Sequence, residues 1–117
     1  MWVFTRFGFF SVVCDTKHGP LNPEMLMIRA RVRSHLEKLK NKFSNLKVFP
    51  IEDYKPGNDY ECRIYVPKQV WENVMAQLVS EIDYGNFKNE AIKEVGYGKY
   101  SSSLSKVWYI MANLGEN

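Results

Sequence analysis

Residues Met25 to Arg33 read MLMIRARVR, and from Ile28 onwards apolar and basic residues alternate. A period of two is typical of a β-strand, whose successive side chains point to opposite faces of a sheet. One face of this predicted strand is apolar and the other is basic. The apolar residues are Leu26, Ile28, Ala30 and Val32, and the alternating arginines are Arg29, Arg31 and Arg33. We therefore expect a sheet with one face covered by helices and one basic face.

Three more strands are predicted around this one. The segments from Trp2 to Arg6 and from Phe9 to Asp15 are rich in Val and Phe, and Gly8 separates them. Further along, Cys62, Ile64 and Val66 alternate with Glu61, Arg63 and Tyr65. The segment from Pro50 to Asp59, which contains Pro, Gly and Asn in succession, is predicted to be a loop.

Amphipathic spacing predicts four helices in the rest of the chain. The first runs from Ser34 to about Ser44 and is expected to open with a capping box. The longest pattern follows Pro67 and places Trp71 on its apolar stripe, and a shorter helix is predicted over 87–95. The last helix is expected to begin near 101–103. Its inward-facing residues are expected to be Leu104, Val107, Trp108 and Met111.

The order of these elements predicts one α+β domain over residues 1–117. Sequential strands with short connections tend to be neighbours, so the expected sheet is antiparallel or mixed and has about four strands. The helices are expected on one face, in a ferredoxin-like arrangement. An apolar fraction of 45% gives a chain of this length enough material for a core without a metal or a disulfide.

The net charge of +3 conceals an uneven distribution. Seven basic residues and one acidic residue lie between Ile28 and Lys47, a local balance of +6. The rest of the chain has nine basic and twelve acidic residues, a balance of −3. The electric field of such a basic segment attracts anionic partners. A basic surface that only faces solvent and binds no ligand is a common alternative.

The expected basic face is the main candidate for a functional surface. Adjacent arginines on one face repel each other unless carboxylates or a ligand lie opposite, and Glu61 is the one acidic residue expected there. Arginines beside aromatic rings on an open sheet can hold a single-stranded nucleic acid through its phosphates and bases. The predicted binding residues are Arg29, Arg31, Arg33, Lys38, Arg63 and Tyr65. We therefore expect a small binding module whose partner is anionic, either nucleic acid or an acidic protein surface.

Two other classes of function stay open. A self-associating structural or regulatory domain, in the simplest case a homodimer, would join the basic face of one copy to acidic residues of another. Those acidic residues are Glu52, Asp53, Asp59 and Glu61. An enzyme ranks last, because no acid, base and nucleophile converge in sequence order. Cys14, Asp15 and His18 lie close in the sequence, but strand alternation points Cys14 and Asp15 to opposite faces.

No cofactor and no metal site are expected. Cys14 and Cys62 belong to no Cys-x-x-Cys pair, and neither has a histidine at metal-ligand spacing. Both are expected to be reduced thiols buried beneath the helices, in a protein whose expected location is the cytoplasm. No stretch approaches the ~20 apolar residues needed to span a bilayer, so no membrane partner is predicted.

Four short segments carry a resemblance to known proteins. The chain opens with MWVFT at residues 1–5 and continues with GFFSVV at residues 8–13. Later it has IDYGNFK at residues 82–88 and the pair Val107-Trp108 in the last predicted helix. With these segments the chain resembles, over most of its length, a family of small bacterial proteins of uncharacterised function. The resemblance implies a bacterial or phage origin and no particular mechanism.

Overall fold

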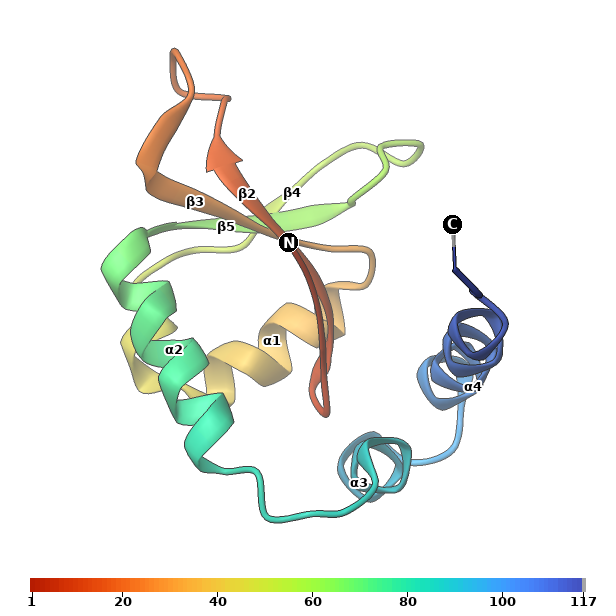
Figure 1. Ribbon diagram of the computed structural model, residues 1–117. Coiled ribbons are helices and arrows are strands. Elements are labelled where there is room, and N and C mark those ends of the chain that lie inside the picture. The colour runs from red at the N-terminus through yellow and green to blue at the C-terminus, as the bar shows by residue number, and fades with distance from the viewer. Residues whose placement is uncertain (117) are drawn as a thin grey trace. The chain divides into compact units, whose positions relative to one another are not determined.

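The structure, a computed structural model, describes residues 1–116. These residues form two compact units, the first from Met1 to Ile82 and the second from Asp83 onwards. The first unit contains a five-stranded sheet and two α-helices, and the second contains two α-helices (Figure 1). That the chain folds as the single domain predicted over residues 1–117 stays a prediction.

The sheet of the first unit is antiparallel throughout, in the order β1-β2-β3-β5-β4. Its first three strands form a meander. Helix α1 (Arg33–Lys42) follows them, and the chain then returns to place β5 beside β3 and β4 at the edge. The strands are β1 (Trp2–Thr5), β2 (Gly8–Asp15), β3 (Asn22–Ala30), β4 (Glu52–Asp53) and β5 (Cys62–Pro67).

The α+β class and an antiparallel sheet are therefore confirmed. The sheet has five strands and not about four, because Glu52 and Asp53 pair with β5 inside the segment that was predicted to be a loop. The ferredoxin-like arrangement is not confirmed. The first unit has the element order β-β-β-α-β-β-α, whereas a ferredoxin-like unit has the order β-α-β-β-α-β.

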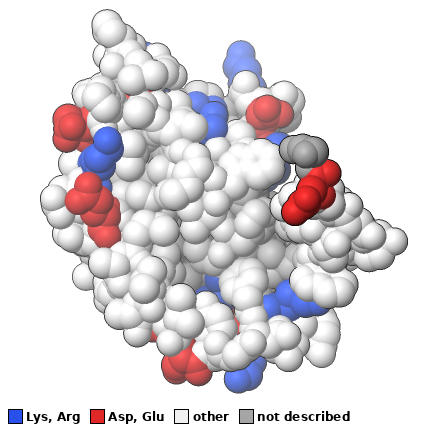
Figure 2. All heavy atoms as spheres, in the orientation of Figure 1, with Lys and Arg blue, Asp and Glu red and all other residues white. Residues whose placement is uncertain are grey.

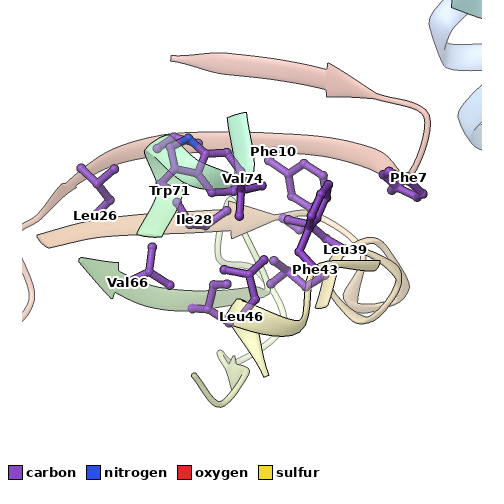
Figure 3. Close-up of a cluster of buried hydrophobic side chains, with 14 of the residues drawn as sticks. Phe7, Phe10, Leu26, Ile28, Leu39, Phe43, Leu46, Val66, Trp71 and Val74 are labelled. Atoms are coloured by element: carbon purple, nitrogen blue, oxygen red, sulfur yellow. The ribbon is translucent and has the colours of Figure 1, made fainter. Parts of the chain in front are cut away.

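Helices α1 and α2 (Lys68–Ser80) pack on one face of the sheet. Each has an apolar stripe at helical spacing, with Leu36 and Leu39 buried in α1 and Trp71 and Val74 buried in α2. Figure 3 shows Leu39, Trp71 and Val74 in the core. Alternate residues of the strands face them, as predicted for β3 and β5. The buried strand residues are Phe10, Val12, Leu26, Ile28, Ala30, Cys62, Ile64 and Val66.

The junction between β3 and α1 differs from the prediction. The strand was expected to continue to Arg33, but it ends at Ala30, and Val32 is the N-cap residue of α1. Val32 is consequently 48% exposed and does not face the helices. The capping box predicted at Ser34 is absent from the described structure. Ser34 lies inside the helix, and the N-cap residue, Val32, makes no side-chain hydrogen bond to the first turn. Arg31 and Arg33 thus lie beyond the strand.

The second unit consists of α3 (Phe87–Val95) and α4 (Lys99–Ala112), which pack against each other. The side chain of Asn86 caps α3 by accepting a hydrogen bond of 3.0 Å from the Asn89 N–H. Leu104 is buried, but Trp108 and Met111 are exposed, so the prediction that they face inward is wrong. With fourteen residues against nine, α4 is longer than α3, and α3 cannot cover all of it.

None of the helices formed by residues 1–116 is long and apolar enough to cross a membrane.

Candidate binding surface on the sheet

The face of the sheet opposite α1 and α2 carries a row of side chains that crosses all five strands. The register pairs Trp2 with Ser11 and Ser11 with Arg29. It then pairs Arg29 with Arg63, and Arg63 with Glu52. Arg29 and Arg63 are therefore direct cross-strand neighbours. Two like charges in this position destabilise a sheet unless other groups compensate them.

Arg29 is held by a hydroxyl group and an aromatic ring. Its Nη2 donates a hydrogen bond of 2.8 Å to the Oγ of Ser11, which is buried. Its guanidinium lies 4.6 Å from the centroid of the Tyr60 ring, and that ring is buried as well. The guanidinium of Arg31 approaches the same ring at 4.5 Å. Each cation–π contact stabilises by about 0.5–2 kcal/mol, depending on how far it is desolvated.

Arg63 has a corresponding partner in Tyr54. The guanidinium lies 4.0 Å from the centroid of the Tyr54 ring, and Nη1 lies 3.7 Å from the sulfur of Met27. The hydroxyl groups of Tyr54 and Tyr65 share a hydrogen bond of 2.8 Å. Burial and this hydrogen bond raise the pKa of Tyr65, so its hydroxyl stays neutral beside the arginines. We call the group of Arg29, Arg63, Tyr54, Tyr60 and Tyr65 the arginine–tyrosine surface.

Carboxylates do not compensate this arginine pair. Within residues 1–116, neither Arg29 nor Arg63 forms an ion pair, and Glu52, the next residue of the row, pairs with Lys17 at 3.5 Å. The Nε of both arginines is buried without a hydrogen-bond partner in the described chain. An unsatisfied buried donor costs about 1–3 kcal/mol. The surface therefore holds two positive charges whose hydrogen-bonding capacity is only partly used.

The other predicted binding residues are placed differently. Arg31 lies 3.9 Å from a carboxylate oxygen of Asp59 and donates to the Asp59 carbonyl at 2.6 Å. Arg33 pairs with Glu37 at 2.9 Å and also with Asp53. Lys38 is exposed on α1, which packs on the opposite side of the sheet. The structure thus brings together Arg29, Arg63 and Tyr65, and Arg31 reaches the same group only through the Tyr60 ring.

Sequence reasoning missed several residues of this face. Tyr54 and Tyr60 lie in and beside the segment predicted as a loop, and no periodicity indicated that their rings would contact the sheet. Trp2 and Phe4 could have been found, because they have the same strand parity in β1 and Val3 alternates with them toward the core.

Trp2, Phe4 and Phe9 form an aromatic cluster at the β1 side of this face. The rings of Phe4 and Phe9 are stacked, with centroids 4.7 Å apart and planes inclined by 22°. Trp2 meets Phe9 edge to face at 5.8 Å. Trp2 is 68% exposed and Phe4 is 37% exposed. Trp2 and Phe4 thus present an accessible aromatic patch on this face of the sheet.

On the face shown in Figure 2, basic and acidic side chains are interspersed, with wide uncharged areas between them. Several basic residues of the first unit are also neutralised locally, including Lys17, Arg31, Arg33 and Lys42. The candidate surface is therefore the unpaired arginine pair and not the whole basic segment from Ile28 to Lys47.

The polar groups near His18 form a turn. Asp15 accepts a hydrogen bond of 2.8 Å from the Lys17 N–H, and its other carboxylate oxygen lies 2.8 Å from Nδ1 of His18. Burial acts to raise the pKa of Asp15, but the hydrogen bonds with His18 and Lys17 outweigh it and lower the pKa. His18 also lines an open hollow of about 530 Å³ together with Tyr65 and residues 20–23. No contact joins Cys14 to this pair among the hydrogen bonds of the described residues.

The two cysteines differ from each other. Cys62 is buried, as predicted, and its burial raises the pKa of its thiol to about 11. Cys14 is only partly buried, so the prediction of two buried thiols is wrong for Cys14. Both are free thiols. In the part of the chain that the structure describes, no group of three or more His, Cys, Asp or Glu residues could hold a metal ion.

Comparison of the chain with protein-family models, with curated proteins and with solved structures gave no match. The resemblance to small bacterial proteins stays a prediction from the sequence.

Proposed function

We propose that the protein is a non-enzymatic binding module that engages an anionic partner through the sheet face opposite α1 and α2. The arginine–tyrosine surface is the centre of this site. The observation that carries the proposal is the cross-strand pair of Arg29 and Arg63, which lacks a carboxylate partner within residues 1–116. Buried or half-buried charges are ordinarily paired, so an unpaired couple supports a role for an external anion.

The geometry around the arginines favours recognition of an anion. Guanidinium groups bind carboxylates and phosphates through parallel N–H groups, and such charge-assisted hydrogen bonds are roughly twice as strong as neutral ones. The Tyr54 and Tyr60 rings restrict the two side chains, since each guanidinium lies within 5 Å of a ring centroid. A restricted side chain loses less conformational entropy when it binds than a free one does.

A comparison of two double variants tests the proposal. Arg29→Gln/Arg63→Gln removes the unpaired arginines, and Arg31→Gln/Arg33→Gln removes two arginines that already have carboxylate partners. Both variants lose the same formal charge. On a heparin column, which presents a polyanion, we expect the first variant to elute at a clearly lower salt concentration than the second.

The Arg31/Arg33 variant is a strict control, because these two arginines are more exposed than Arg29 and Arg63. If exposure alone governed retention, the Arg31/Arg33 variant would elute first. Equal elution of the two variants, or elution in that reverse order, would contradict the proposal. Circular dichroism of each variant tests whether the fold is retained.

Self-association through opposite charges receives less support. Of the four acidic residues expected to meet the basic face of another copy, three already form ion pairs within the chain. Glu52 pairs with Lys17, Asp53 with Arg33, and Asp59 with Arg31. A homodimer of this kind would first have to break these pairs.

A further inference from the structure

The aromatic cluster and the arginine–tyrosine surface belong to one continuous stretch of the sheet. Trp2 stands opposite Ser11, and the hydroxyl of Ser11 accepts the hydrogen bond from Arg29. Phe9 is two residues before Ser11 on β2, and its side chain points to the same face. Neighbouring strands lie about 4.8 Å apart, so the Trp2 and Arg63 backbones are separated by three steps, roughly 14 Å. A short ligand can therefore reach the rings and the guanidinium groups together.

The two halves of this stretch favour different chemical groups. The guanidinium groups of Arg29 and Arg63 favour negatively charged oxygen atoms. The exposed rings of Trp2 and Phe4 favour flat, aromatic partners, because a ring face offers stacking area and no hydrogen bond. An acidic peptide satisfies the arginines but gains little from the rings. A single-stranded nucleic acid has both features, phosphates along its backbone and unpaired bases beside them.

Building on the proposed function, we infer that the anionic partner is a single-stranded nucleic acid. Its bases stack on Trp2 and Phe4, and its phosphates contact Arg29 and Arg63. A duplex fits less well, because its bases are already stacked and paired, and their faces are not free to cover the rings. The Phe4–Phe9 stack fixes the orientation of the Phe4 ring before a base arrives.

The test uses two probes that differ only in their bases. One is a single-stranded oligothymidylate of about 12 nucleotides, within the site sizes of single-strand-binding domains. The other is an abasic sugar–phosphate chain of the same length. Fluorescence anisotropy of labelled probes gives both affinities. We expect the native protein to bind the oligothymidylate about ten-fold more tightly, which corresponds to stacking of about one base.

Two variants locate the stacking. Trp2→Ala/Phe4→Ala is expected to remove the preference for the base-bearing probe and to leave the affinity for the abasic probe unchanged. Trp108→Ala is the matched control, because Trp108 is similarly exposed, at 60%, but belongs to the second unit. This control is expected to keep the preference.

Three other binding results would contradict the assignment to nucleic acid, the proposed function, or both. Equal affinity of the native protein for both probes would overturn the assignment to nucleic acid and leave the proposed function intact. Binding to poly-L-glutamate without binding to the oligothymidylate would overturn it in favour of an acidic protein partner. Failure to bind any of these polyanions at low salt would overturn both the assignment and the proposed function.

Discussion

Among single residues, the tryptophans of helices α2 and α4 lie in different surroundings. Trp71 and Trp108 both lie on apolar helical stripes, and both were predicted to be core residues. Trp71 is 3% exposed and packs against the sheet, whereas Trp108 is 60% exposed. The difference arises from what faces each helix, since α2 packs on β3 and β5 and α4 packs on the shorter α3.

Replacement of each tryptophan by alanine should separate these environments. Trp71→Ala is expected to lower the free energy of unfolding by ~3 to 5 kcal/mol, as for a large aromatic side chain removed from a core. Trp108→Ala is expected to lower it by only about 1 kcal/mol or less, because this exposed side chain loses little more than the contact of its ring with Nζ of Lys88, which lies 4.5 Å from the ring centroid. Urea unfolding measures both values. A large loss for Trp108→Ala would show that another surface covers this residue in solution.

His35 is a second residue whose burial has a measurable consequence. Burial of its imidazole, with a smaller effect of Lys38, lowers the pKa of His35 from its ordinary value of 6.5. Its Nδ1 accepts a hydrogen bond of 3.3 Å from the Phe9 N–H, which requires this nitrogen to be unprotonated. Because the unfolded state binds the proton more tightly, the free energy of unfolding should fall as the pH falls below about 6.5.

This pH dependence is expected to begin as the pH falls below about 6.5, and His35→Gln should remove most of it. Urea unfolding of the native protein and the variant at several pH values provides the measurement. Asp15, whose pKa is lowered from 3.8, contributes to the pH dependence only at lower pH, because its stabilisation is lost as the pH falls below that value. If His35→Gln left the pH dependence of the free energy of unfolding unchanged, a group other than His35 would be its cause.

Among the helices and strands, the sequence predicted correctly those in which burial of one face imposes a strand or helix period on the apolar residues. The parities of β3 and β5, the apolar stripe of α2 and the bounds of α3 all follow from alternating or helical patterns. The strand β4 has only two residues, too few to show a period. The positions of Tyr54 and Tyr60 depend on contacts distant in sequence, with Arg63 and with Arg29. The site was therefore predicted as a row of arginines, without the rings that hold two of them.

The turn between β1 and β2 depends on Gly8 for a reason that the structure makes explicit. Gly8 has a φ of +154°, and a Cβ atom there would lie 2.3 Å from Cγ of His35. Gly8→Ala is expected to destabilise the protein by ~2 to 4 kcal/mol, through backbone strain and this clash. Gly19→Ala is the control, since its φ is +128° but no atom lies within 4 Å of the added Cβ. Thermal unfolding should show a clearly smaller loss for Gly19→Ala, and equal losses would exclude the clash as the cause.

Over the chain as a whole, the large cluster of buried hydrophobic residues lies in the first unit, whereas the second unit buries Ala91 and Leu104. Every residue of the core cluster, and every half-buried apolar residue packed against it, precedes Ile82. A fragment of residues 1–82 is therefore expected to fold alone, with a cooperative thermal transition and a buried Trp71. Circular dichroism and tryptophan fluorescence of the fragment provide the measurement. A fragment without a cooperative transition would show that the chain folds only as the single domain predicted from its sequence.

The proposed function requires that Arg29 and Arg63 neutralise charges of a partner. The salt dependence of binding measures this neutralisation, because each phosphate neutralised on a single strand adds about 0.7 to the slope of log affinity against log salt. For the oligothymidylate we expect the slope to become shallower by about 1.4 in Arg29→Gln/Arg63→Gln, the amount for two phosphates. In Arg31→Gln/Arg33→Gln the slope should stay close to that of the native protein. Equal slopes for the native protein and Arg29→Gln/Arg63→Gln would contradict the claim.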